Sequence, residues 1–333
     1  MPVALLLALM TAPADAGVFQ RKTMHGDWPD TQVEREFVLP RGWFELQVDV
    51  DNKASTGMRN RNGALLPFRN DATLHHSELV FNFDHGFSDR VKLHLEVPIV
   101  RASLANNLGA NVATMARGDV HTSVTWQPWF NRVLAGAFEL DLKSPSGVEW
   151  PGGYLDGPGN FSSFLTGTGT NNLGGTLYTK YRLGDAASVG VAGSYVYKFP
   201  GIVGYVIEVD GFGNGWINPG NEIRTDVDAT VQIGSDFALS GVWTWSHRGQ
   251  YVIASSGKGN RVQWDQGSVV QRPGAFQDLG AQISMEPAPA MEVALRVSGQ
   301  IKGSDTRTFG HLGLEEFSPQ PGLTMGFSGT VRW

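Results

Sequence analysis

Apolar and polar residues alternate along this chain in stretches of roughly ten residues, which is the length of a strand that crosses a bilayer. The last stretch shows the pattern most clearly. Counting back from Trp333, apolar or glycine residues occupy every second position, among them Val331, Phe327 and Leu323. The residues between them are polar or small. A period of two indicates a β-strand with one apolar and one polar face.

About twelve such stretches can be read along the sequence, and the connections between them alternate in length. The stretches cover residues 43–51, 77–85, 90–100, 119–126, 134–143, 173–183, 188–199, 222–233, 237–248, 278–286, 291–302 and 323–333. Short connections, as at 184–187, are followed by long ones, as at 200–221. This is typical of an outer-membrane barrel with tight periplasmic turns and extended outer loops. A soluble β-sandwich would explain the alternating residues but not the alternating connections.

The sequence therefore predicts an all-β fold, an up-and-down antiparallel transmembrane β-barrel of about 12 strands in a bacterial outer membrane. The first strand is expected near Trp43 and the last ends at Trp333, so that residues 42–333 form the barrel. Closure is favoured because every backbone polar group must be paired within hydrocarbon. An even number of strands puts both ends of the barrel on the side of the short turns.

The N-terminal residues carry the pattern of an export signal. Residues 3–10 are apolar but far shorter than the roughly 20 residues of a membrane-spanning helix. They are followed by Ala14-Asp15-Ala16, which is similar to a signal-peptidase site, although no basic residue precedes Arg21. We predict a signal peptide over residues 1–16, as in Gram-negative export, and a periplasmic N-terminal segment over residues 17–41.

Composition excludes several kinds of chemistry. The chain has no cysteine, which excludes disulfides and thiolate ligands, and its net charge of −6 offers no basic field for nucleic acid. His75 lies on the opposite strand face from His76 and Glu78, so one metal ion would not collect all three. We expect no cofactor and no metal.

Four segments resemble one group of outer-membrane proteins: "FVLPRGWFEL", "RGDV", "LDLKSPSG" and "LTGTGTNNLGGTLYTKYRL". Through them, residues from about 37 to 333 resemble the Gram-negative transporter family linked to the meta-cleavage pathway of phenol degradation. The resemblance implies a porin-like barrel that transports small compounds, apolar or aromatic ones among them. The terminal aromatic residue also resembles the C-terminal signal that the barrel-assembly machinery reads.

The inward faces of the strands hold the candidate functional residues, because a lumen is polar and a lipid face is not. The candidate lumen residues are Glu45, Asp49, Arg90, Lys92, His94, Glu96, Glu139, Asp141, Lys180, Arg182, Arg224, Asp226, Asp228 and Arg296. Barrels of about eight strands are filled by side chains and those of sixteen or more leave wide channels, so twelve is intermediate. We predict a channel for small solutes with a narrow charged lumen. The alternative is a structural or surface-interaction barrel whose lumen is filled.

Aromatic residues near the strand ends are candidates for the membrane interface, where amphipathic rings are favoured. They are Trp43, Phe87, Trp129, Phe237, Trp245 and Trp333, with outer-membrane lipids and lipopolysaccharide as their expected partners. A third, less favoured function comes from His121 and Ser123, whose spacing is similar to the His–Ser pair of outer-membrane phospholipase A, a barrel lipid hydrolase. Both residues face inward, whereas such an enzyme must meet an acyl ester in the lipid, so we expect no enzyme.

Overall fold

The computed structural model describes most of the chain as β-strands. The described residues are 31–59, 62–68, 71, 73–105, 111–147, 170–208, 211–234, 236–255, 268–271, 273–288, 290–303 and 322–333. No helix in these ranges is long and apolar enough to cross a membrane. The predicted signal peptide and residues 17–30 lie outside the described residues.

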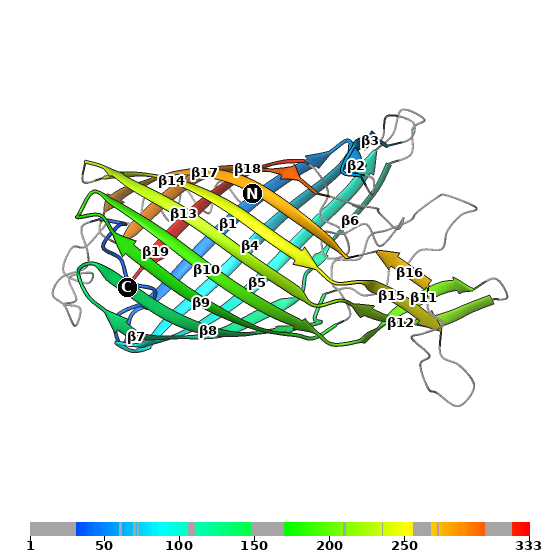
Figure 1. Cartoon of the computed structure of the whole chain (residues 1–333), viewed down its shortest axis with the longest axis horizontal. Helices are drawn as coiled ribbons and strands as arrows, with labels where there is room; N and C mark the ends of the chain where they lie inside the picture. The colour runs from blue at the N-terminus through cyan, green and yellow to red at the C-terminus, as the bar shows by residue number, and fades with distance from the viewer. Residues whose placement is uncertain are drawn as a thin grey trace.

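A closed antiparallel barrel forms the body of the molecule, as the sequence predicts (Figure 1). The main sheet has 13 strands, and the pairing of β4 with β5 closes all of them except β6 into a 12-strand barrel. The barrel strands are β1 (Phe44–Ser55), β4 (Thr73–Ser88), β5 (Val91–Ala105), β7 (Val120–Phe130), β8 (Leu134–Ser144), β9 (Asn172–Arg182), β10 (Ala187–Lys198), β13 (Glu222–Ile233), β14 (Phe237–Arg248), β17 (Gly274–Ala288), β18 (Met291–Lys302) and β19 (Leu323–Arg332). Each pairs with its neighbours in this series, so the topology is up-and-down.

The last strand closes the barrel against the first. β1 and β19 are antiparallel from Glu45↔Arg332 to Ala54↔Leu323. The Phe44 N–H donates to the Trp333 carbonyl (2.9 Å), and the Trp333 N–H donates to the Phe44 carbonyl (3.0 Å). The alternating C-terminal stretch is therefore the seam strand, and its closure leaves no unpaired edge between the two ends of the chain.

Additional strands extend the barrel at the end of the long connections (Figure 1). A four-stranded sheet of β11 (Gly201–Glu208), β12 (Gly211–Pro219), β15 (Tyr251–Ser255) and β16 (Ser268–Gln271) continues β10, β13, β14 and β17. A hairpin forms from β2 (Gly57–Arg59) and β3 (Leu65–Pro67). β6 (Asn111–Arg117) pairs with β5 from Ile99 to Ala105, near the long connections, whereas β7 pairs with β5 from Val91 to Glu96, near the short turn. The prediction that these connections are loops is wrong for the residues in these strands.

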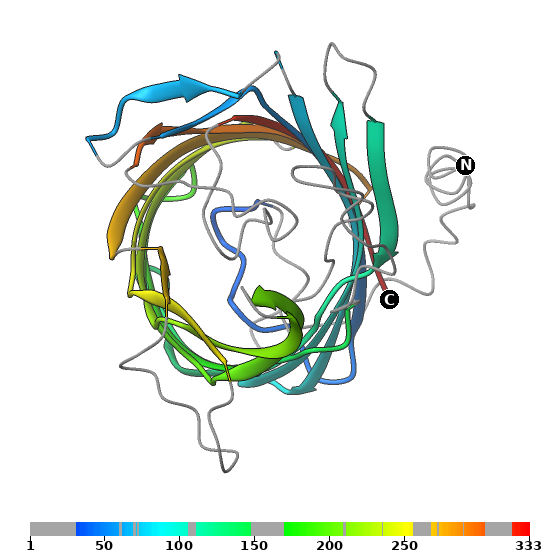
Figure 2. The same cartoon turned by 90° about the vertical axis from the view of Figure 1, so that its right-hand side faces the viewer.

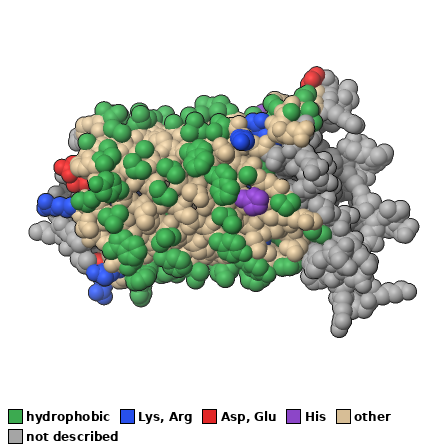
Figure 3. All heavy atoms as spheres, in the orientation of Figure 1, with side chains coloured by type: hydrophobic (Ala, Val, Ile, Leu, Met, Phe, Trp, Pro, Cys, Tyr) green, Lys and Arg blue, Asp and Glu red, His purple; other side chains and the backbone are tan. Residues whose placement is uncertain are grey.

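The outer face of the barrel is apolar. Leu95, Phe138, Leu177 and Leu295 are among the large apolar side chains that are exposed on it. Figure 3 shows such side chains spread over the barrel wall, with most of the visible charged side chains near its two ends. An apolar band of this kind is what a lipid-facing surface requires, because charge is costly at the depth of the hydrocarbon.

Exposed aromatic residues mark the outer face near the short turns. Phe87, Trp129, Phe237 and Trp333 are all at least 43% exposed, and Trp245, toward the other end, is partly exposed. Trp43 contradicts the sequence analysis, because it is 3% exposed and precedes the first strand. Phe44 takes its place on the outer face and stacks against Trp333, with 6.1 Å between ring centroids.

Candidate functional site in the barrel lumen

Strand pairing places the predicted charged residues on the inner wall. Of the candidates from the sequence, Glu45, Asp49, Lys92, His94, Glu96, Glu139, Asp141, Lys180, Arg182, Arg224, Asp226, Asp228 and Arg296 all occupy inward positions of their strands. Arg90 is the exception. It lies in the exposed turn between β4 and β5, because the strand period does not continue through the turn at 89–90.

One ion-pair cluster joins the two sides of the barrel seam. Arg296 on β18 reaches over β19 to β1, where its Nε donates to Asp51 Oδ1 (2.8 Å) and its Nη1 donates to Asp49 Oδ1 (3.0 Å). Asp49 is buried and also accepts hydrogen bonds from Gln47 (2.9 Å) and Asn82 (2.6 Å). These three donors hold the Asp49 carboxylate against the inner wall, and the Arg296 guanidinium compensates its charge.

A second cluster lies on β4 and β5 and includes an acid that the sequence analysis did not select. The His94 Nδ1 is 2.8 Å from Asp84 Oδ1, and Lys92 Nζ lies 3.4 Å from Asp84 Oδ2. His94 Nε2 is 4.0 Å from Glu96 Oε2. Asp84 faces inward in the alternating stretch 77–85, so its position could have been read from the sequence, but its partners could not.

Acids on β8 and β13 are less completely paired. Asp226 accepts from Arg224 Nε (2.9 Å), and Thr125 donates to Glu139 (2.9 Å). Within the described part of the chain, Asp141 and Asp228 form no ion pair. The Arg224 side chain is 50% exposed although it faces inward, so water reaches the lumen at this level.

The segment before β1 lies inside the barrel. Figure 2 shows residues 31–42, in dark blue, within the ring of strands. Arg182 on β9 holds the segment, with Nε donating to the Val33 carbonyl (3.1 Å) and Nη2 donating to the Glu34 carbonyl (2.7 Å). Lys180 Nζ donates to the carbonyls of Gln32 (3.1 Å) and Arg35 (3.3 Å). We call residues 31–42 the lumen segment.

Further contacts tie the lumen segment to other strands around the barrel. Gln127 on β7 accepts from the Phe37 N–H (2.9 Å), and Gln232 on β13 accepts from the Gln32 N–H (3.2 Å). Arg35 forms ion pairs with Glu286 on β17 and Glu292 on β18. Phe37 also packs against Tyr178 on β9 (ring centroids 5.5 Å apart). The prediction that residues 17–41 are periplasmic is corrected for residues 31–41, which lie in the lumen; residues 17–30 lie outside the described residues.

The lumen segment packs against the inner wall at the short-turn end of the barrel. Small inward residues at this end are buried, and they are Ala135, Ala137, Ser188, Ala238, Ser284, Ala294 and Thr330. Val33 of the segment is itself 0% exposed. Gly86 on β4 allows a close approach of the segment, since a Cβ at this position would collide with the Pro40 carbonyl oxygen and fall 2.8 Å from the Leu39 carbonyl oxygen. Inward residues near the middle of the barrel, such as Ala192 and Ser194, stay partly accessible, whereas Lys143 and Phe276 near the long connections are again buried. The accessible part of the lumen therefore lies between two packed ends.

Docking of the lumen segment is expected to weaken as pH rises, because of Glu36. Burial raises the pKa of this carboxyl to about 7; Arg182 acts in the opposite sense and Asp89 in the same sense. The docked segment therefore binds a proton that the released segment loses near its ordinary pKa of 4.5. This contribution to docking is complete below that value and is lost as pH rises through about 7.

The chain has no cysteine, so a single fluorophore on a cysteine at position 31 can report release. We expect more release at about pH 8 than at about pH 5. Glu36→Gln should remove the pH dependence, whereas Glu34→Gln should keep it. Equal release at both pH values in the parent would contradict the assignment to Glu36.

His121 and Ser123, the less favoured His–Ser pair of the sequence analysis, are not arranged for catalysis in the structure. The Ser123 Oγ is buried and has no hydrogen-bond partner, so His121 does not activate it in this arrangement. Nucleophilic catalysis requires that contact. No group of three or more His, Asp or Glu side chains among the described residues is arranged to hold a metal ion.

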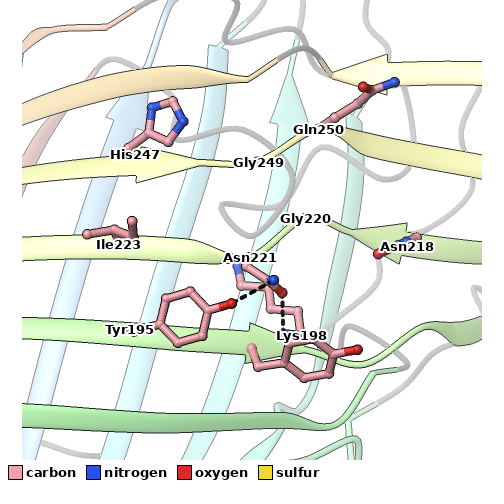
Figure 4. A pocket seen from close by; sticks show the side chains of 10 residues that line it. Tyr195, Lys198, Asn218, Gly220, Asn221, Ile223, His247, Gly249 and Gln250 are labelled. Carbon is pink, nitrogen blue, oxygen red and sulfur yellow. Dashed lines mark hydrogen bonds between the residues drawn. The ribbon is translucent and has the colours of Figure 1, made fainter.

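A groove of about 530 Å³ lies on the outer face, where the barrel strands meet the four-stranded sheet (Figure 4). Tyr195, Ile223 and His247 line it from outward positions of their strands. Asn221 joins two strands there, donating to Tyr195 Oη (2.8 Å) and accepting from the Lys198 N–H (3.1 Å). These outward residues face away from the lumen, so the groove is not part of the candidate passage.

Comparison with known proteins identifies the fold. The structure is similar to the crystal structure of the COG4313 outer membrane channel from Pseudomonas putida F1, with a TM-score of 0.64 and 12% sequence identity over 89% of this chain and 97% of that one. The fold is that of an outer-membrane β-barrel. At this identity the similarity concerns the fold alone. No protein-family model and no curated protein matches the sequence.

Two further solved structures are more distantly similar. The NanC porin has a TM-score of 0.47 and 9% identity over 86% of this chain and 98% of that one. The TodX deltaS2S3 mutant monoaromatic hydrocarbon channel has a TM-score of 0.49 and 10% identity over 88% of this chain and 90% of that one. These similarities are too weak to support an argument, and none of the comparisons bears on a link to phenol degradation.

Proposed function

We propose that this chain is an outer-membrane channel that passes small solutes through a narrow, charged lumen, with the lumen segment closing the short-turn end. The observation that carries the proposal is the accessible charge in the lumen between the lumen segment and the long connections. Arg224 is half exposed inside the closed barrel, and Asp141 and Asp228 face the same space without an ion-pair partner among the described residues. A lumen that is only structural has no need of unpaired acids, because uncompensated charge is costly where it is buried.

The second candidate function is a structural barrel with a filled lumen. The hydrogen bonds and ion pairs of Arg182 and Arg35 favour it, because they hold the lumen segment firmly across one end. The two functions differ in whether the segment moves. For the channel, the segment is a gate; for the structural barrel, it is a permanent part of the core.

Selectivity of the open barrel tests the proposal. In the double variant Asp226→Asn/Asp228→Asn, two acids of β13 lose their charge with little change of size. Charged side chains that line a pore set its ion preference, so we expect a lower permeability ratio of K⁺ to Cl⁻ in planar bilayers. The difference should shrink at high salt, because screening weakens the field of the acids.

The single variants refine this test, because the two acids differ in their contacts. Asp226 is held by Arg224, so Asp226→Asn should also lower the urea concentration at which the barrel unfolds. Asp228→Asn breaks no ion pair of the described residues and should change selectivity with little loss of stability. A parent barrel that never conducts, while Asp226→Asn loses stability, would support the structural barrel instead.

Two further aspects of the proposal rest on the sequence. The resemblance to the phenol-linked transporter family adds small apolar or aromatic compounds as candidate solutes. The exposed aromatic residues and the C-terminal strand suit insertion among outer-membrane lipids and lipopolysaccharide by the assembly machinery.

A further inference from the structure

Each of three inward carboxylates lies beside a glycine of the neighbouring strand. The pairs are directly opposite in register: Asp51↔Gly326, Asp141↔Gly174 and Asp228↔Gly190. A Cβ added to Gly174 would fall 2.6 Å from the Asp141 Cγ, and one added to Gly190 would fall 2.8 Å from the Asp228 Cγ. Real Cβ atoms essentially never approach another heavy atom within 3.0 Å, so each carboxylate occupies the space that a side chain on the glycine would fill.

The three pairs differ in how their charge is compensated. Arg296 lies opposite Gly326 on its other side, and it closes an ion pair with Asp51 across that glycine. Asp228 lies across Gly190 from Lys180, but Lys180 donates to carbonyls of the lumen segment instead. Val196 lies across Gly174 from Asp141 and offers no charge. The first pair therefore has a compensated charge, whereas the other two carboxylates have no ion-pair partner among the described residues.

We propose that Gly174 and Gly190 determine the selectivity of the passage for small cations. Each glycine leaves a notch in the wall, and the opposite carboxylate lies in this notch instead of projecting into the lumen. The negative charge then faces the passage without narrowing it, which favours cations over anions at a given width. This inference rests on the channel function proposed above.

Glycines on the outer face of the same strands have room for a side chain, unlike Gly174 and Gly190. Nothing lies within 4 Å of a Cβ built on Gly193, and the nearest atom to one on Gly175 is 3.7 Å away, which is an ordinary contact. Gly175 is adjacent to Gly174, and Gly193 lies on β10 with Gly190. They provide matched control positions for the same substitution.

The test is the open-state current of single channels in the full-length protein. This amplitude reports on the lumen wall, whereas the fraction of time spent open reports on the lumen segment. We expect Gly174→Ala and Gly190→Ala each to lower the current, because the new methyl group forces the carboxylate into the passage. Gly175→Ala and Gly193→Ala should keep the parent current. Gly326→Ala should act differently, lowering the unfolding midpoint in urea because it breaks the Arg296 pair.

A double variant shows whether the carboxylate carries the effect. Gly190→Ala/Asp228→Ala should regain the parent current, since the methyl group then has room, but with a lower K⁺ to Cl⁻ permeability ratio. Gly190→Ala could fail to insert into the membrane. In that case, insertion of the double variant would still support the clash between residue 190 and Asp228, and failure of the double variant to insert would reject the clash. Parent current and selectivity in both single glycine variants would overturn the inference while leaving the channel function intact. A parent that conducts no ions would reject the channel function itself.

Discussion

Replacement of Arg182 by alanine is expected to release the lumen segment and to open the barrel. The guanidinium donates to the carbonyls of Val33 (3.1 Å), Glu34 (2.7 Å) and Arg35 (3.4 Å), and its side chain is buried. Hydrogen bonds of charged groups contribute about 1.5–3 kcal/mol each. A loss of about 3 kcal/mol of docking free energy would change the ratio of docked to released segment roughly 100-fold. Open probability in single-channel recordings and the label at position 31 both measure this ratio.

Three controls separate release of the segment from damage to the barrel. Arg182 also donates to the Asn131 carbonyl (3.2 Å) and lies 4.6 Å from the centre of the Phe130 ring, so unfolding in urea must be measured beside gating. Arg182→Lys should give a smaller effect, because one ammonium group cannot reproduce the planar fork of the guanidinium. Arg224→Ala removes a lumen cation with no contact to the segment in the described residues, and should leave docking unchanged. A folded Arg182→Ala variant with parent gating would contradict the prediction.

The facing of most side chains could be predicted from the sequence, because the strand period is two. His94 and Leu95 illustrate this, since one contacts Asp84 in the lumen and the other is exposed on the outer face. The same rule fails where a strand ends. Arg90 was assigned by extending the period beyond the start of β5, and the structure places it in an exposed turn. Trp43 was assigned to the interface as an aromatic residue near a strand end, although the period puts it on the face of Glu45, and the structure buries it before the first strand.

Ion-pair partners could not be predicted, because they depend on strand register and barrel closure. Arg296 meets Asp49 and Asp51 only because barrel closure leaves β19 as the single strand between β18 and β1. Arg224 pairs with Asp226 on its own strand, although the sequence equally allowed partners across the lumen. Alternation assigns a face to each residue and carries no information about register between strands that are far apart in the sequence.

The lumen segment was missed for a different reason. Its docking uses backbone carbonyls, as in the contacts of Arg182 with Val33 and Glu34. Every residue has a backbone carbonyl, so the amino-acid sequence does not indicate which ones accept such hydrogen bonds. The segment also has no strand or helix period, so it reads as a linker. Arg182 and Lys180 were selected as lumen residues, but their role as anchors required the structure.

Leu95→Arg is expected to destabilise the barrel by about 2–4 kcal/mol, the cost of an arginine on the lipid face near the bilayer midplane. Leu95 lies on the outward face of β5 and is 39% exposed. Its lipid neighbours cannot hydrate a guanidinium, and the nearest water lies beyond the membrane interface. The measurement is the free energy of unfolding from urea titration in lipid vesicles.

His94→Arg is the matched control, because it adds the same side chain at the adjacent residue on the opposite face. There the guanidinium meets Asp84, which already lies 2.8 Å from His94 and 3.4 Å from Lys92. The acid and the accessible lumen should compensate most of the charge, so we expect a much smaller loss of stability than for Leu95→Arg. Equal losses for the two variants would mean that β5 does not present Leu95 to lipid, and the assignment of lipid and lumen faces would fail for the whole barrel, since the strands are joined in one register.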